Sequence, residues 1–240
     1  MEVVARAGRR ELSFDGFGFP LPAEVDDAAA LALAAHGVTA WHLLRTCAHL
    51  RRGESVVVHD AAGGVGGMAV QLAVSFGAGR VVATAATQAQ RRLALRLGAD
   101  AALDSTAPDL GERLPVAGLA DVVVGLPVTH PVIGGVGGAR GVGTRPVDPG
   151  LVDGALAVLA PFGRLVCHGE PVDVDPVRLG SRAVVGFRLT DCLARPEMVV
   201  AALSELTGLT AAGRLHPLPH LLPTPRPRSP HATPPTRTTR

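Results

Sequence analysis

The sequence predicts an α/β fold in which helices cover both faces of a doubly wound parallel sheet. Short, almost wholly apolar runs recur along the chain, and a stretch with helical periodicity follows most of them. A glycine-rich turn joins one of these runs to its helix. The chain is 47% hydrophobic but only 3% aromatic, so its core must be built mainly from Ala, Val and Leu.

The predicted elements alternate regularly once the first helices have passed. Asp26 and Asp27 begin a helical stretch that runs to about residue 35, because acidic side chains suit the first turn of a helix. A second helix is expected over 38–50. Beyond it we expect strands over 55–59, 80–85, 101–103, 120–124, 163–168 and 183–187, and helices over 65–76, 88–97, 151–159 and 196–212.

Three segments lie outside this alternation. Residues 1–25 are interrupted by Gly and Pro and should form a strand or two and a loop. Residues 127–150 are a Gly/Pro-rich insertion, either a functional lid or, as we favour, disordered, because few side chains could order it. Residues 215–240 are a Pro/Arg-rich tail without an acidic residue, expected to be disordered. The main domain is therefore expected over 26–214.

Composition and charge narrow the class of protein. A formal net charge of +2 gives no sign of nucleic-acid binding. No apolar run is long enough to span a membrane, and the N-terminus lacks the apolar core of a secretory signal. The cysteines Cys47, Cys167 and Cys192 are widely spaced, so neither a disulfide framework nor a structural zinc site is expected. We therefore expect a reduced, cytoplasmic protein without a metal.

The turn after the strand at 55–59 is the most informative stretch of the chain. Residues 59–66 read His-Asp-Ala-Ala-Gly-Gly-Val-Gly. Strand, glycine turn and helix in this order place backbone N–H groups against a pyrophosphate, as in a Rossmann dinucleotide-binding domain. The glycines could also be turn chemistry alone, but the next apolar run follows at the distance a βαβ unit requires. The expected pyrophosphate contacts are Ala62, Gly63, Gly64, Val65 and Gly66.

The end of the strand at 80–85 favours NADP(H) over NAD(H). An NAD site needs an Asp or Glu there for the ribose 2′-hydroxyl, and residues 84–87 are small and neutral. Thr84 and Ala86 would therefore line a pocket with room for a 2′-phosphate. Arg91 could supply the positive charge, although Arg91 and Arg92 could equally form a solvated helix face.

An ordered set of short segments links the chain to a known family. They are His-Gly-Val-Thr-Ala-Trp at 36–41, the glycine turn at 57–66, Leu-Gly-Ala-Asp at 97–100, Leu-Ala-Pro-Phe-Gly-Arg-Leu-Val at 159–166, and Val-Gly-Phe at 185–187. Over about residues 24–215 the chain resembles the medium-chain, alcohol dehydrogenase-like, dehydrogenase/reductase superfamily. It looks most like the zinc-independent quinone oxidoreductase (zeta-crystallin-like) and enoyl reductase branch.

That resemblance implies an oxidoreductase that transfers hydride from NADPH to a quinone or to an activated alkene of the enone or enoyl type. It also implies a homodimer formed through the edge strand near 183–187. His168 could alternatively be a hydrogen-bonded core histidine. The residues that the resemblance places along the cofactor are Ser105 at the adenosine end, and His168, Gly169, Leu189 and Thr190 at the nicotinamide half.

The chain departs from the family at both ends. Residues 1–25 are expected to be a remnant of the family's N-terminal chaperonin-10-like barrel, and the tail replaces the return of the chain to that barrel. Because the family's substrate-facing residues come mainly from the barrel, we assign no catalytic residue. A non-catalytic NADP-binding module or degraded paralogue is therefore the alternative function. A methyltransferase using S-adenosylmethionine ranks last, because no acid follows the second strand of the domain.

Overall fold

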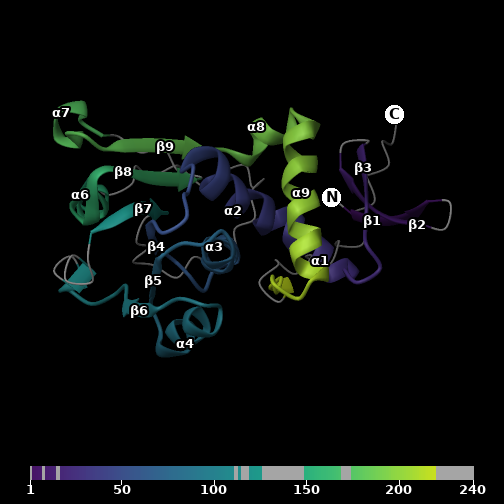
Figure 1. The fold of residues 1–240 in the computed structure, drawn as a ribbon, viewed down its shortest axis with the longest axis horizontal. Helices are drawn as coiled ribbons and strands as arrows, with labels where there is room; N and C mark the ends of the chain where they lie inside the picture. Colours follow the sequence, from purple (N-terminus) through teal and green to yellow (C-terminus); the bar gives the residue numbers. More distant parts are fainter. Residues whose placement is uncertain are drawn as a thin grey trace, which may run out of the picture.

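The computed structural model describes residues 2–6, 9–14, 17–110, 113–114, 119–125, 149–168 and 174–219. Almost all of the insertion expected at 127–150, and the tail beyond 219, lie outside these ranges. Within them the chain forms a three-stranded antiparallel sheet and a six-stranded parallel sheet (Figure 1). Among the described residues, no helix is both long and apolar enough to cross a membrane.

The larger sheet confirms the predicted doubly wound architecture. Its strands run parallel in the order β6-β5-β4-β7-β8-β9. The order reverses between β4 and β7, and open α/β sheets bind ligands at such a point, outside the carboxyl ends of their strands. The bounds are β4 (Ser55–Val58), β5 (Arg80–Ala85), β6 (Ala101–Asp104), β7 (Ala120–Val124), β8 (Leu159–His168) and β9 (Ala183–Phe187).

Strand β8 begins earlier than predicted. Residues 159–162 were expected to end a helix and turn, but Leu159 already pairs with Ala120 of β7. The pairing then shifts register before Arg164. Phe162 lies in this irregular stretch at a φ of 66° and is 79% exposed. The local sequence is compatible with a turn, and pairing with β7 decides in favour of an irregular strand.

Along the chain, a helix follows most strands of the larger sheet. Asp26 caps the first helix of the chain, accepting a hydrogen bond from the amide of Ala29 at 2.7 Å, which confirms the predicted start. The helices are α1 (Asp27–Ala32), α2 (Val38–His42), α3 (Gly64–Ser75), α4 (Gln88–Arg96), α6 (Pro149–Val158), α7 (Pro176–Leu179), α8 (Leu189–Leu193) and α9 (Pro196–Ala211), with π-helical turns η1 (Leu33–Gly37) and η2 (Leu43–Cys47).

The predicted break between the first two helices is wrong. Gly37 has helical angles, with φ at −63°, and the chain stays helical from Asp27 to Cys47 through η1 and η2. A Cβ on Gly37 would lie 3.2 Å from Leu206 of α9 and 3.3 Å from Met68 of α3. This glycine therefore allows three helices to approach one another and does not end a helix.

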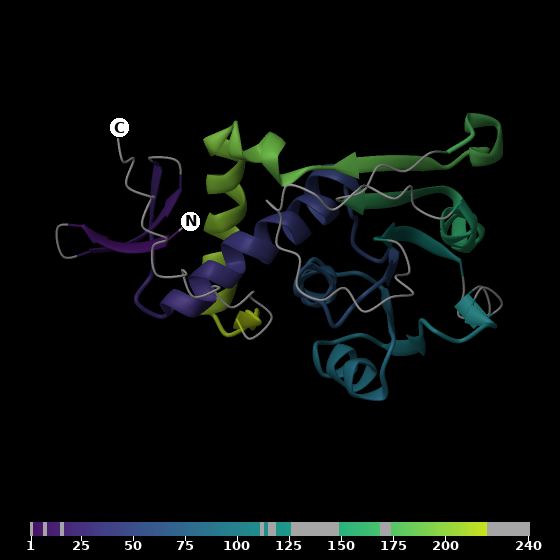
Figure 2. The ribbon, with the colours of Figure 1, turned by 180° about the vertical axis from the view of Figure 1, so that it is seen from behind.

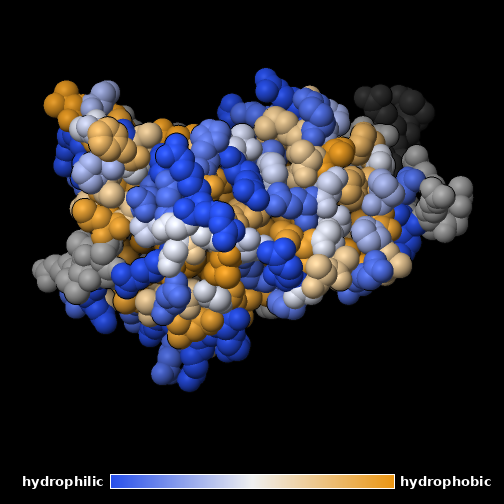
Figure 3. Space-filling model, in the orientation of Figure 1, coloured by the Kyte–Doolittle hydropathy of each residue, from blue (hydrophilic) through white to orange (hydrophobic). Residues whose placement is uncertain are grey.

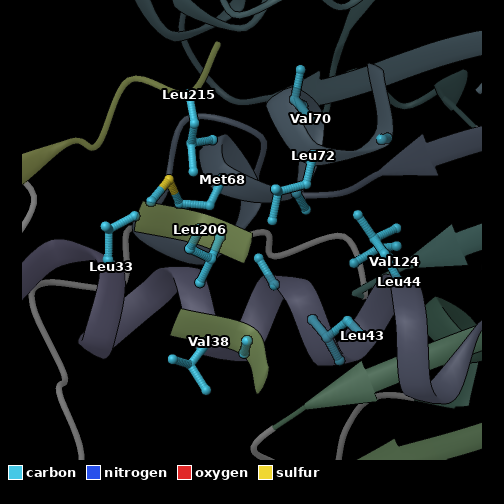
Figure 4. Packing of buried hydrophobic residues seen from close by; sticks show 14 of the residues in the cluster. Leu33, Val38, Leu43, Leu44, Met68, Val70, Leu72, Val124, Leu206 and Leu215 are labelled. Carbon is cyan, nitrogen blue, oxygen red and sulfur yellow. The ribbon is translucent and has the colours of Figure 1, made fainter. Parts of the chain in front are cut away.

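Two apolar clusters fill the faces of the larger sheet. Along β4 the side chains alternate, so that Val56 and Val58 belong to one cluster and Val57 to the other. The first cluster joins the sheet to α1, α2, α3 and α9, and Figure 4 shows Met68, Leu206 and Leu215 packed within it. The second joins the sheet to α6. Helices thus cover both faces, as predicted.

The described part of residues 1–25 contains more strand than the strand or two that the sequence predicts. It contains a meander of β1 (Glu2–Arg6), β2 (Arg9–Phe14) and β3 (Phe17–Pro20). This sheet lies beside α1 and α9, on the side away from the larger sheet (Figure 2). Arg10 fixes the connection, since its guanidinium contacts Asp27 at 2.8 Å and the carbonyl oxygen of Val25 at 2.8 Å.

The boundary predicted at residue 214 lies too early. Leu215 and Leu218 are 1% and 7% exposed. The side chain of Gln71 in α3 accepts from the amide of His216 at 2.8 Å and donates to its carbonyl oxygen at 3.0 Å. Residues 215–218 therefore pack on α3. The prolines from Pro217 onward suggested a tail, but Leu215 and Leu218 supply the apolar contact.

Candidate functional site

The glycine turn between β4 and α3 is tightly closed. Asp60 adopts a φ of 49°, and its carbonyl oxygen accepts from the amide of Gly63 at 2.9 Å. A Cβ on Gly66 would overlap that same carbonyl, and one on Gly64 would lie 2.5 Å from the ring of His36. Gly66 is therefore required by close approach of the backbone, whereas a side chain at Gly64 would have to displace the ring of His36.

The same turn leaves backbone donors free. Gly63 is the N-cap of α3, and the first amide bonded along the helix is that of Gly67, which donates to the carbonyl of Gly63 at 2.8 Å. Within the described part of the chain, the amides of Gly64, Val65 and Gly66 have no acceptor. Three unpaired N–H groups at the positive end of a helix dipole suit an anion.

Thr84 takes a different place from the one expected. It is fully buried, and its Oγ1 lies 2.9 Å from Nδ1 of His59. Burial lowers the pKa of His59 to about 4, so its ring is neutral at physiological pH. Thr84 therefore does not line a pocket and instead supports the strand end from which the turn departs. Ala86 directly follows β5 and is exposed.

The neighbouring arginines Arg91 and Arg92 of α4 point in different directions. Arg92 is exposed. The surface over α4, at the lower end of Figure 3, is largely hydrophilic. Arg91 turns back to the end of β5, where its Nη1 donates to the carbonyl oxygens of Ala85 at 3.2 Å and Ala86 at 3.0 Å. The same Nη1 lies 2.8 Å from Oδ2 of Asp104.

Asp104 is the residue that sequence reasoning missed. No acid follows β5 in the sequence, but β6 pairs with β5 so that Asp104 lies opposite Ala85. Hydrogen bonds from Thr106, followed by the nearby Arg91 guanidinium, hold the pKa of the Asp104 carboxyl below its usual range. The available signal was that parallel strands end at one edge, so the last residue of 101–104 must lie near the last residue of 80–85.

The remaining predicted residues also lie at carboxyl ends of strands. Ser105 is 8% exposed, and its amide donates to the carbonyl of Ala85 at 3.2 Å. His168 ends β8 with an exposed side chain, and desolvation by the surrounding protein lowers the pKa of its ring. Leu189 and Thr190 begin α8 directly after β9, with Thr190 exposed. Gly169 lies outside the described residues.

A hollow of about 370 Å³ opens at the carboxyl end of β9. Phe187 forms part of its wall, and the ring of His42 stacks on Phe187 with centroids 5.5 Å apart. A smaller hollow of about 60 Å³ lies at the amino ends of β4, β5 and β7, away from the residues above. Sequence reasoning did not find the larger one, whose lining is Thr46, Gly186, Phe187, Arg188, Asp191, Cys192, Arg195 and Met198.

The cysteines do not form a metal centre. Burial raises the pKa of the Cys167 thiol to about 11, and burial also raises the pKa values of Cys47 and Cys192. All three thiols are free. Among the residues that the structure describes, no three His, Cys, Asp or Glu side chains are grouped as metal ligands would be.

Comparison with known proteins connects this site to a family. The sequence profile of zinc-binding dehydrogenases matches residues 64–207. The spectinabilin polyketide synthase system protein NorB of Streptomyces orinoci is 33% identical over 204 residues, which are 83% of this chain and 8% of NorB. The chain therefore spans only a small part of that relative.

Solved structures agree with the profile. The quinone oxidoreductase of Thermus thermophilus, described also in complex with NADPH, superposes with a TM-score of 0.68 and 29% identity over 89% of this chain and 68% of that one. The CurK enoyl reductase superposes with a TM-score of 0.66 and 26% identity over 84% of this chain and 57% of that one. The chain therefore belongs to the family whose profile is described as zinc-binding dehydrogenase. Within the medium-chain dehydrogenase/reductase superfamily, it belongs to the branch of quinone oxidoreductases and enoyl reductases, which is zinc-independent despite the name of the profile.

Proposed function

We propose that this chain binds NADPH along the carboxyl edge of the larger sheet and transfers a hydride to a quinone or to an enone or enoyl acceptor. The observation that carries the proposal is the set of free amides at Gly64, Val65 and Gly66, beside the reversal of strand order. The similarity to a quinone oxidoreductase described with NADPH and to an enoyl reductase supports it.

The residues present fit a dinucleotide. A Cβ on Gly64 would meet the ring of His36 and one on Gly66 the carbonyl of Asp60, so these glycines let the turn close tightly. The amides of the turn would hold the pyrophosphate. Arg91, at the end of β5, would receive the 2′-phosphate. Ser105, bonded through its amide to Ala85, would lie at the adenosine end.

When bound, NADPH supplies the hydride, and the chain has to orient the nicotinamide and keep water away. His168 and Thr190 present exposed polar side chains at the ends of β8 and β9, where they would hydrogen-bond the nicotinamide half. Leu189 is partly buried against the core and offers an apolar surface there. The hollow at the end of β9 is the space that would take the acceptor.

Zinc does not fit the residues described. A catalytic zinc needs three protein ligands, and no such group exists among these residues. The proposed hydride transfer uses no step at a metal.

The test is a fluorescence titration of the purified chain with NADPH and NADH, followed by NADPH oxidation against a panel of quinones and enones. Saturable NADPH binding with turnover supports the proposal. Binding without turnover on any acceptor favours the alternative, a non-catalytic NADP-binding module. Failure to bind either dinucleotide contradicts both.

We further propose that the chain forms a homodimer through β9. This strand ends the order of the described sheet, so one row of its backbone N–H and C=O groups faces away from β8. Ala183 and Gly186 are exposed along it. Sedimentation equilibrium at micromolar concentration should give the mass of two chains, and the mass of one chain would contradict the pairing.

A further inference from the structure

The end of β5 carries no carboxylate, but the neighbouring strand β6 ends in Asp104, whose carboxylate lies beside it. In the parallel pairing of β5 with β6, Ala85 lies opposite Asp104. Arg91 donates to the carbonyl oxygen of Ala85 and forms an ion pair with Asp104, so the guanidinium joins the ends of both strands. The acidic side chain of Asp104 and the basic side chain of Arg91, from two different elements, thus meet where a dinucleotide site of this fold receives the adenosine ribose.

Asp104 is held by groups of the protein on both of its oxygens. Oδ1 accepts from the amide of Thr106 at 2.9 Å and from its hydroxyl at 2.7 Å, and Oδ2 lies 2.8 Å from Arg91. Its side chain is only 31% exposed. This carboxylate is therefore oriented toward Thr106 and Arg91, which distinguishes it from an acid left free to accept a ribose hydroxyl.

Arg91 is anchored through Nη1, which donates to the carbonyl oxygens of Ala85 and Ala86 and makes the 2.8 Å approach to Asp104. Among the described residues, Nε and Nη2 donate no hydrogen bond, and the side chain is 22% exposed. The edge formed by Nε and Nη2 carries two parallel N–H donors, which is the geometry that binds a phosphate through two hydrogen bonds.

The start of α4 is fixed as well. Thr87 and Gln90 form a capping box, in which the Thr87 hydroxyl accepts from the Gln90 amide at 3.2 Å and the Gln90 side chain accepts from the Thr87 amide at 3.0 Å. Gln90 is thereby occupied, and Arg91 is the cation of this turn that reaches the end of β5.

We propose that Asp104 is a positioning residue for NADPH: its carboxylate, itself held by Thr106, fixes Nη1 of Arg91 so that the Nε–Nη2 edge remains open to the 2′-phosphate. The inference rests on the proposed function and adds a specificity determinant from β6. It requires that Asp104 act on NADPH through Arg91 and have no effect on NADH, which lacks the 2′-phosphate.

The test is a double-mutant cycle on Kd, with NADPH and NADH titrated in parallel into the full chain, Asp104→Ala, Arg91→Ala and the double variant. Arg91→Ala should raise the Kd for NADPH by about ten- to a hundredfold, since it removes charged hydrogen bonds. Asp104→Ala should raise the Kd for NADPH by about threefold to tenfold, and this increase should vanish in the Arg91→Ala background. The Kd for NADH should change in none of them.

Asp109→Ala is the matched control, because it removes the same charge from an exposed carboxylate that lies 3.9 Å from Arg113 and makes no ion pair with Arg91. It should leave both Kd values unchanged. An Asp104→Ala variant that binds NADPH more tightly, or that weakens NADPH and NADH equally, would overturn the inference. If the unaltered chain binds both dinucleotides and Arg91→Ala changes neither, the inference fails while the proposed function stands. If the unaltered chain binds neither, the proposed function fails first.

Discussion

The two ends of the proposed dinucleotide site are built in different ways. At the pyrophosphate end the donors are backbone amides of Gly64, Val65 and Gly66, placed by a turn within one short segment. At the 2′-phosphate end the donor is the Arg91 side chain, held by Asp104 from another strand. The first end depends on the absence of side chains and the second on contacts between them, so substitutions should affect the two ends separately.

The largest effect is expected for Gly66→Ala, because the added methyl would overlap the carbonyl of Asp60, which is backbone and cannot turn aside. We expect a loss of about 1–3 kcal/mol or more in the free energy of unfolding. The Kd values for NADPH and NADH should rise together, by at least about tenfold. Thermal unfolding and parallel titrations measure both.

Gly208→Ala in α9 is its matched control. A Cβ there would meet no atom within 4 Å, and the residue is exposed. The substitution should stabilise the chain by about 0.4–1 kcal/mol and leave both Kd values unchanged. If Gly66→Ala behaves in the same way, the turn is not as closed as the structure has it.

Leu218→Ala should have the next largest effect, on the support beneath the pyrophosphate end. Leu218 is 7% exposed, and its Cδ1 lies within 2.7 Å of a Cβ built on Gly67. Its truncation should lower the free energy of unfolding by about 2–3 kcal/mol. The ratio of the Kd values for NADH and NADPH should remain that of the unaltered chain, because Arg91 is untouched. A changed ratio would show that the two ends are coupled.

A smaller, pH-dependent effect is expected from His59. Its folded pKa is about 4 against an ordinary 6.5, so the unfolded chain binds a proton in this interval that the folded chain does not. The contribution of the neutral His59 ring to the free energy of unfolding should therefore be fully present above about pH 6.5 and should be lost as the pH falls toward 4. His59→Phe should reduce this slope in denaturant titrations. Because burial also lowers the pKa values of His36 and His42, part of the slope remains. An unchanged slope would contradict the assignment.

The smallest effect is expected for Thr87→Ala at the 2′-phosphate end. The substitution removes the capping hydroxyl of α4 and should cost about 1 kcal/mol in the free energy of unfolding. Because fraying of α4 loosens Arg91 but not the glycine turn, NADPH binding should weaken slightly and NADH binding should not. Equal weakening of both would mean that α4 supports the whole site.

The same contrast explains what the sequence could predict. The glycine turn, the alternation of strands and helices and the covering of both faces of the sheet follow from local patterns, and residues 59–66 predict a pyrophosphate site without any tertiary information. Asp104 could not be found in this way, since its role depends on the register of β6 against β5. Thr84 was misplaced because a residue at a strand end faces either the core or the solvent, and pairing with His59 decides for the core.

Two further errors have the same origin. A break was predicted between helices ending near residue 35 and beginning near residue 38, but Gly37 stays helical and permits contact with Leu206 and Met68, which come from distant segments. Leu215 and Leu218 were assigned to a tail because of the neighbouring prolines, although α3 offers them a surface. In each case a local rule was overridden by packing against a segment far away in the sequence.

The most direct test of the account is the titration of the unaltered chain with NADPH and NADH side by side, monitored by cofactor fluorescence. The account predicts saturable binding of both, because the glycine turn holds the shared pyrophosphate, and a lower Kd for NADPH, because Arg91 is open to the 2′-phosphate. Binding of neither dinucleotide would contradict the pyrophosphate site, and tighter binding of NADH would contradict the role of Arg91.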